Sequence, residues 1–192
     1  MGSVLLAGLL LAGWRVLNGG YQYQGSLIDP PAPAADFTLR DQNGEIFRLS
    51  DQKGKVVLIF FGYTNCPDVC PITLTDFKRI KDELGDLAAE GRFVLITVDP
   101  ERDTVERLRN YLPSYDPSFY GLTGERAKLE RVWQSYGVYQ DQLEDGSEAG
   151  YEVEHTARIY AIDTQGNWRL TYPFEMDRKA VIEDVRHLLK EN

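Results

Sequence analysis

The segment that decides the fold is residues 55–71, KVVLIFFGYTNCPDVCP, in which an unbroken apolar run leads directly into a loop with two cysteines. Strands that are buried on both faces of a sheet read as continuous apolar runs. The segment therefore predicts a central strand that ends close to Cys66 and Cys70. Ligands of open α/β sheets bind at the carboxyl ends of the strands, so we expect a functional site at these cysteines.

Pro71 sets the expected start of the helix that follows. Proline disfavours helical backbone angles at the residue before it, and its missing N–H is tolerated at the first helical position. We therefore predict a helix from Pro71, with Cys70 at its cap and Cys66 in the preceding loop. Free N–H groups and the helix dipole favour thiolates there, so both sulfurs are expected to be reactive. The alternative, two buried cysteines that act as small hydrophobic residues, fits poorly with the neighbouring prolines and aspartate.

The spacing of the two cysteines, Cys66 and Cys70, permits two chemical forms. Four residues of separation in a turn allow a Cα–Cα distance of roughly 4.4 to 6.8 Å, which is the usual range for a disulfide. A bridged form and a metal-bound form are therefore both feasible.

A second apolar run at Phe93–Ile96 predicts another central strand. Apolar residues recur at helical spacing between the two runs, so the unit is β-α-β with a right-handed crossover. Upstream, Phe37–Leu39 and Ile46–Leu49 flank Asp41–Gly44, whose Asn-Gly pair predicts a hairpin because it readily adopts positive φ. The helical residues are Leu74, Phe77, Ile80, Leu84 and Leu87.

The rest of the domain adds further helices and strands. We expect helices around 105–112, 129–136 and 177–190, and two strands at 155–162 and 168–172. Together these elements predict an α/β fold in which helices flank a central mixed β-sheet and a β-hairpin lies at the start of the domain.

Composition excludes several classes of protein. The 192 residues are 43% hydrophobic and 27% charged, which is typical of a globular chain with room for one domain and a short appendage. The formal net charge is −9, and so acidic a chain repels phosphate backbones, which excludes nucleic acid as a partner. A cationic partner or a metal cation would suit this charge, although acidity often serves solubility alone.

The amino terminus differs in character from everything that follows. Its first fourteen residues carry no charge, and residues 1–17 predict an uncleaved hydrophobic membrane anchor, with a secretory signal segment as the alternative. Glycine and proline in residues 18–35 predict a linker, which places the folded domain at 36–192. An export element would put this domain in an oxidising compartment, where a cysteine pair can cycle.

The chain has few strong ligands for a soft or borderline metal: two cysteines, two histidines and two methionines. His187 lies in the last predicted helix, opposite its apolar stripe, so we expect its side chain to be exposed to solvent. His155 lies where an acidic loop enters a strand, and such a junction can aim a side chain at the end of a neighbouring strand. Spacing along the chain leaves open whether His155 is a ligand or an ordinary polar residue.

Five stretches of the chain together resemble the Sco/SenC family of thioredoxin-like, membrane-anchored copper proteins involved in cytochrome c oxidase assembly. The most specific is the Phe-Gly-Tyr-Thr-x-Cys-Pro-Asp-Val-Cys-Pro stretch, and the late His-Thr pair identifies His155 as the third member of the site. Two positions depart from the family pattern: Val105 stands where proline is frequent, and Glu154 where aspartate is frequent. The matching stretches are Asp36–Leu39, Gly54–Leu58, Phe61–Pro71, Thr97–Thr104 and Glu154–Thr156.

The resemblance implies a thioredoxin-like fold and a metal site formed by Cys66, Cys70 and His155. Two thiolates and one imidazole suit a copper ion, Cu(I) and also Cu(II), better than structural zinc, which needs a fourth ligand. The implied function is a metallochaperone that assists assembly of the binuclear copper centre of cytochrome c oxidase.

The resemblance also implies partners and a location. The expected partners are the copper-site subunit of the oxidase and other copper chaperones or thiol reductants. The protein is expected to be membrane-anchored through its amino-terminal segment, with the domain facing the bacterial periplasm or an equivalent extracytoplasmic space.

Two other functions stay open. The placement of Cys66 and Cys70 also suits a membrane-anchored thiol-disulfide oxidoreductase that keeps the oxidase cysteines reduced, in which case both cysteines are catalytic. A peroxiredoxin-like peroxidase would share the Asp36–Leu39 entry, but the sequence has no matching peroxidatic Thr-x-x-Cys arrangement.

Asp99, Arg102 and Asp103 follow the second central strand, so they belong to the same edge of the sheet as the cysteines. By resemblance, they would support the site or the docking of a partner. As ordinary residues, they would form a helix cap and a surface ion pair ahead of Val105, and this second arrangement is the one we expect.

Overall fold

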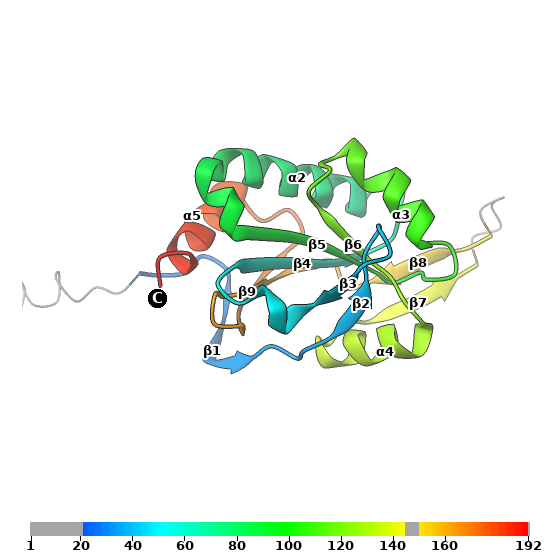
Figure 1. The fold of residues 1–192 in the computed structure, drawn as a ribbon, viewed down its shortest axis with the longest axis horizontal. Coiled ribbons are helices and arrows are strands. Elements are labelled where there is room, and N and C mark those ends of the chain that lie inside the picture. Colours follow the sequence, from blue (N-terminus) through cyan, green and yellow to red (C-terminus); the bar gives the residue numbers. More distant parts are fainter. Residues whose placement is uncertain (1–20, 145–149, 192) are drawn as a thin grey trace, which may run out of the picture.

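The centre of the protein is a six-stranded sheet (Figure 1). The computed structural model describes residues 21–144 and 150–191. Three neighbouring strands are parallel and the other pairs are antiparallel, so the sheet is mixed, as predicted. In spatial order the strands are β1 (Ser26–Pro33), β10 (Asn167–Pro173), β9 (Arg158–Ile162), β4 (Val56–Gly62), β5 (Gly91–Thr97) and β6 (Tyr120–Leu122).

Helices cover both faces of this sheet. In Figure 1, α2 (Val69–Leu84) and α3 (Val105–Tyr111) lie above the sheet, and α4 (Arg126–Ser135) lies below it. α5 (Arg178–Leu188) packs against α2. Because β4 has neighbours on both sides and helices on both faces, all seven of its residues are buried. Three short 3₁₀ helices are η1 (Leu49–Gln52), η2 (Gly85–Glu90) and η3 (Leu112–Ser114).

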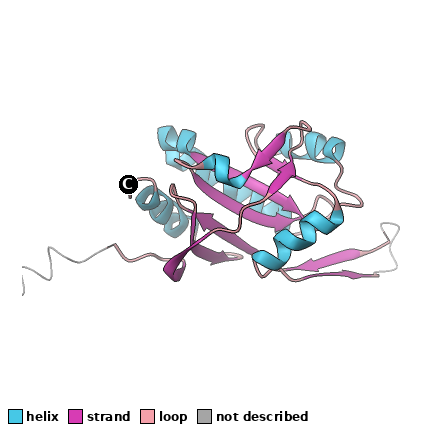
Figure 2. Cartoon of the chain, turned by 60° about the horizontal axis from the view of Figure 1, so that its bottom comes forward, coloured by secondary structure: helices cyan, strands magenta, loops and turns pink. Residues whose placement is uncertain are grey.

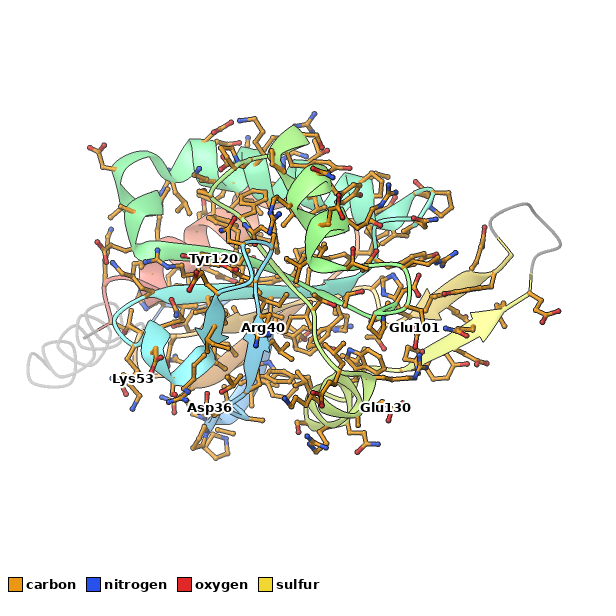
Figure 3. The ribbon with its side chains drawn as sticks, turned by 45° about the vertical axis from the view of Figure 1, so that its right-hand side comes forward. Asp36, Arg40, Lys53, Glu101, Tyr120 and Glu130 are labelled. Carbon is orange, nitrogen blue, oxygen red and sulfur yellow. The ribbon has the colours of Figure 1, made fainter. Side chains whose placement is uncertain are left out.

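The predicted amino-terminal hairpin is formed by β2 (Thr38–Arg40) and β3 (Ile46–Arg48). Gly44 in its turn has φ +84°, the left-handed conformation that an Asn-Gly turn favours. Arg40 forms a β-bridge with Thr123, just after β6, which fixes the hairpin to the edge of the main sheet (Figure 3).

A second hairpin was not predicted. It consists of β7 (Gln140–Leu143) and β8 (Glu152–His155), which pair antiparallel and project from the body of the protein (Figure 2). The expected strand at 155–162 is therefore divided: His155 ends β8, and the main-sheet strand β9 begins only at Arg158.

β1 lies in a segment for which the sequence predicted a linker. It pairs antiparallel with β10, so that Ser26 lies opposite Thr171 and Pro33 opposite Asn167. This strand is at the edge of the sheet, and an edge strand tolerates prolines because one of its sides needs no N–H donors. The folded region therefore begins upstream of the predicted boundary at residue 36.

The predicted membrane anchor, residues 1–17, lies outside the described residues. Across residues 21–144 and 150–191, no helix is long and apolar enough to cross a membrane. The anchor therefore stays a prediction from the sequence.

Aromatic packing holds the strand that leads to the cysteines. Phe61 of β4 packs edge to face on Tyr160 of β9, with 5.3 Å between ring centroids, and lies 5.7 Å from the ring of Tyr136. Tyr136 follows α4 and its hydroxyl donates a hydrogen bond to the Ala35 carbonyl (2.9 Å). The carboxyl end of β4 is thus a firm support for the loop that follows it.

Candidate metal site

The cysteine loop begins where β4 ends, and α2 begins two residues earlier than predicted. The helix starts at Val69, so Cys66 lies in the loop and Cys70 in the first helical turn. Pro71 falls in this same turn, where backbone N–H groups have no intrahelical partner, and proline is tolerated there. The earlier start turns the Cys70 side chain inward, and Cys70 is fully buried while Cys66 is half-buried.

The two sulfurs have different surroundings. The Cys70 N–H donates a hydrogen bond to Cys66 Sγ (3.4 Å), and the Tyr63 N–H donates to Cys70 Sγ (3.5 Å). Hydrogen bonding from Cys70, aided by His155, lowers the pKa of Cys66 to about 4 against the opposing effect of burial. Burial raises the pKa of Cys70 far above its ordinary value. The structure therefore distinguishes the two sulfurs, which the sequence analysis treated alike: Cys66 is half-buried with a lowered pKa, and Cys70 is fully buried with a raised pKa.

His155, at the end of β8, brings the imidazole to the cysteines. Its Nε2 lies 3.6 Å from Cys70 Sγ, although the two residues are 85 positions apart in the chain. Its Nδ1 lies 3.3 Å from the Thr156 carbonyl oxygen, and a proton on Nδ1 leaves Nε2 free to bind a metal. The rings of Phe60 and Tyr63 pack edge to face on the imidazole at 5.9 and 5.8 Å between centroids.

The ligand atoms of Cys66, Cys70 and His155 all lie within 4.8 Å of one another. Among the residues that the structure describes, this is the only group of three or more His, Cys, Asp or Glu side chains arranged to hold a metal ion. Its two sulfurs and one imidazole nitrogen form a soft donor set without a carboxylate. The residues singled out from the sequence are thus brought together by the fold.

His187 is elsewhere, at the end of α5, on the opposite side of the molecule from β8 (Figure 1). Its ring stacks on Tyr21 with 4.0 Å between centroids, and its Nε2 lies 3.1 Å from Glu191. Its side chain is 31% exposed, which is less than the sequence analysis expected. The reason is that Tyr21, in the segment before β1, stacks on the imidazole ring.

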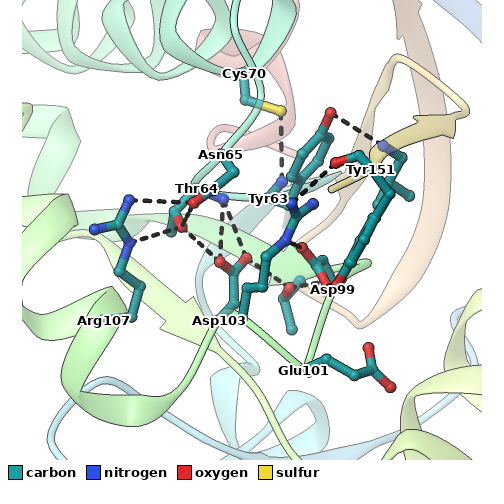
Figure 4. Close-up of polar contacts among 12 residues, drawn as sticks. Tyr63, Thr64, Asn65, Cys70, Asp99, Glu101, Asp103, Arg107 and Tyr151 are labelled. Carbon is teal, nitrogen blue, oxygen red and sulfur yellow. Dashed lines mark hydrogen bonds and ion pairs between the residues drawn. The ribbon is translucent and has the colours of Figure 1, made fainter. Parts of the chain in front are cut away.

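The acidic residues after β5 are not a cap and a surface ion pair, as was expected. Thr104 caps α3 by accepting a hydrogen bond from the Arg107 N–H, whereas Asp99 and Asp103 are fully buried. Burial raises the pKa of Asp103, while hydrogen bonds from Thr64 and Thr97 oppose that shift. Figure 4 shows these carboxylates beneath the cysteine loop, in contact with residues that the sequence analysis did not single out. Tyr63 and Thr64 belong to the cysteine motif, so the sequence offered a signal for these two neighbours of the site. No feature of the sequence indicated Tyr151.

Comparison with known proteins assigns the family. The family model described as SCO1/SenC matches residues 26–190, which includes β1 and α5. The chain belongs to the SCO1/SenC family.

Other SCO1/SenC proteins are similar along most of their length. The SCO2-like protein RC0895 of Rickettsia conorii is 35% identical over 153 residues, which cover 79% of this chain and 75% of that protein. The structure of Bradyrhizobium japonicum ScoI with copper bound is 37% identical, with a TM-score of 0.75, and the match covers 82% of this chain and 99% of that one. Apo Sco1 from Thermus thermophilus is 33% identical, with a TM-score of 0.78 and coverage of 89% and 99%. The predicted thioredoxin-like fold is confirmed.

Proposed function

We propose that this SCO1/SenC protein binds copper through Cys66, Cys70 and His155 and delivers it to the binuclear copper centre of cytochrome c oxidase. The observation that carries the proposal is the convergence of two sulfurs and an imidazole within 4.8 Å from two distant parts of the chain. The copper-bound structure of Bradyrhizobium japonicum ScoI, a relative of similar fold, supports it. In this function copper is a cargo, loaded by other copper chaperones and passed on.

The donor set favours Cu(I). Thiolates are soft ligands and a three-ligand site suits a low-coordinate ion, whereas structural zinc is held by four ligands. Cys66 offers a thiolate at neutral pH, and the proton of Cys70 leaves when the metal binds. The half-buried Cys66 lies at the rim and Cys70 lies inside, so an incoming ligand from a partner would first replace Cys66.

Copper transfer tests this function. The reduced protein, loaded with one equivalent of Cu(I), is mixed without oxygen with the copper-site domain of the oxidase, whose cysteines have been reduced, and the two are separated. We expect copper in the acceptor, and no loading or transfer with Cys66→Ala, while His187→Ala behaves as wild type. If copper stays with the donor although the acceptor takes it from a small Cu(I) complex, the delivery proposal is wrong.

Thiol-disulfide exchange is a second candidate, favoured by the half-buried Cys66 thiolate beside a reduced Cys70. The Cys66 thiolate would attack a partner disulfide to form a mixed disulfide and release one partner thiolate. Cys70 would then attack Cys66, which forms a Cys66–Cys70 disulfide and leaves the partner with two thiols. A thiol reductant returns the protein to its dithiol form. His155→Ala separates the functions, because it should impair copper binding and spare exchange.

The proposal also includes a location. It places the domain on the periplasmic side of a bacterial membrane, or in an equivalent extracytoplasmic space, and assigns the tether to residues 1–17. A fractionation experiment on the full chain tests this: the protein should remain with membranes after a high-salt wash, and a chain shortened to begin at residue 21 should be released.

A further inference from the structure

The metal site has a cysteine half, Cys66 and Cys70, and a histidine half, His155. The loop between β5 and α3 lies under both halves. It carries two fully buried carboxylates, Asp99 and Asp103, separated by only three residues. Figure 4 shows that they face different neighbours: Asp103 faces the loop that leads to the cysteines, and Asp99 faces the segment that leads to His155.

Asp103 holds the cysteine half. It accepts hydrogen bonds from the Thr64 hydroxyl (2.6 Å) and from the Thr64 N–H (3.1 and 3.2 Å to its two oxygens), and from the Thr97 hydroxyl (2.7 Å). Arg107 of α3 donates to Thr64 Oγ1 (3.0 Å) and to Asn65 Oδ1 (3.2 Å). Thr64 and Asn65 directly precede Cys66, so these contacts fix the loop just before its sulfur.

Asp99 and Arg102 hold the histidine half through Tyr151, which directly precedes β8. The Tyr151 hydroxyl donates to Asp99 (2.8 Å), and Arg102 forms an ion pair with Asp99. Arg102 also donates from Nη1 to the Tyr151 carbonyl (2.9 Å), and its guanidinium lies 3.7 Å from the centroid of the Tyr151 ring. Tyr151 is thus held by its hydroxyl, its ring and its backbone, at the point where the chain enters β8.

We propose that the β5–α3 loop sets the separation of the two halves of the site, with Asp103 as a positioning residue for Cys66 and with Asp99, Arg102 and Tyr151 as positioning residues for His155. Metal ligands must lie within about 0.2 Å of their required distances. Here the two sulfurs and the imidazole come from segments 85 positions apart, so a common support has to hold them. The part of the inference that concerns copper rests on the proposed function.

A double-mutant cycle on Cu(I) affinity tests the histidine half. Tyr151→Phe removes only the hydroxyl that reaches Asp99, and should weaken binding about 10-fold, as expected when a residue that orients a ligand is lost. In a His155→Ala background the same change should have no effect, because there is no imidazole to position. Tyr139→Phe is the matched control, because its hydroxyl donates to Asp141 of the same hairpin (3.4 Å) and not, among the described residues, to Asp99; this variant should bind copper as wild type does.

Amide hydrogen exchange of the metal-free protein tests the division between the halves without copper. Tyr151→Phe should speed exchange at Val153, whose N–H donates to the Tyr63 hydroxyl (3.2 Å), and leave Thr64 unchanged. Asp103→Asn should speed exchange at Thr64 and leave Val153 unchanged.

The outcomes separate this inference from the proposed function. The positioning role is overturned if Tyr151→Phe leaves Cu(I) affinity unchanged, or lowers it equally with and without His155. It is also overturned if each variant speeds amide exchange equally at Val153 and Thr64. If the wild-type protein binds no Cu(I), the proposed function fails, while the exchange measurement still decides whether the loop holds the two halves separately.

Discussion

Gly62, the last residue of β4, leaves the space that the Cys70 sulfur occupies. A Cβ at this position would lie 2.8 Å from Cys70 Sγ and 2.6 Å from Phe60 Cε1, whereas ordinary contacts begin at 3.4 Å. To restore an ordinary contact in Gly62→Ala, the sulfur must retreat by about 0.6 Å, three times the tolerance of about 0.2 Å for a metal ligand. We expect Cu(I) affinity to fall by at least about 10-fold. Overpacking should also cost about 2 kcal/mol, or about 4–8 °C in Tm for a chain of this length.

Gly121 in β6 provides a matched control, because a Cβ there would lie 2.4 Å from Leu112 Cδ1 and touch no metal ligand. Thermal unfolding measures the stability of both variants, and competition with a chromophoric Cu(I) chelator measures their affinity. Both variants should lose stability, and only Gly62→Ala should lose affinity for copper. The reasoning is refuted if Gly62→Ala binds copper as tightly as wild type, or if Gly121→Ala loses as much affinity.

Two further predictions concern the thiols and the start of the folded region. Because the pKa of Cys66 is lowered to about 4, its thiolate persists from neutral pH down to about pH 5. Iodoacetamide at pH 6 should therefore label Cys66 and spare Cys70, as measured by peptide mass spectrometry. Labelling of Cys70 before Cys66 would contradict this prediction. Asp184 of α5 is fully buried and accepts hydrogen bonds from the Tyr21 hydroxyl (2.8 Å) and the N–H groups of Gln24 and Gly25 (3.0 and 2.9 Å). In urea denaturation, Asp184→Asn should therefore lower the unfolding free energy by about 3 kcal/mol, and Tyr21→Phe by about 1 kcal/mol. The Cu(I) affinity of both variants should be unchanged. Unaltered urea midpoints would show that the hydrogen bonds to Asp184 do not stabilise the fold.

Local patterns predicted the elements around the cysteines. A continuous apolar run can only be satisfied by burial on both faces, and this is the environment of β4. The Asn-Gly turn likewise defined the β2–β3 hairpin. β1 was not predicted, because its prolines are typical of a linker. It forms a strand by pairing with β10, which is distant in the sequence.

The sequence and the family resemblance singled out the three side chains that the fold brings together, but not their geometry. Spacing along the chain could not bring His155 to the cysteines, because that contact depends on a separate hairpin held by Tyr151 and on the sheet order. The sequence also could not predict that the two thiols differ in burial and in pKa. This difference arises from the inward turn of Cys70, which depends on the start of α2 and on the space left by Gly62.

The most direct test of the central claim is an anaerobic Cu(I) titration of the reduced protein and of His155→Ala, with the free thiols counted in each sample. The account predicts one copper per wild-type chain, held by Cys66, Cys70 and His155, and an affinity at least about 10-fold lower in the variant with both thiols still present. A wild-type protein that retains no copper, or a His155→Ala variant with unchanged affinity, would contradict it.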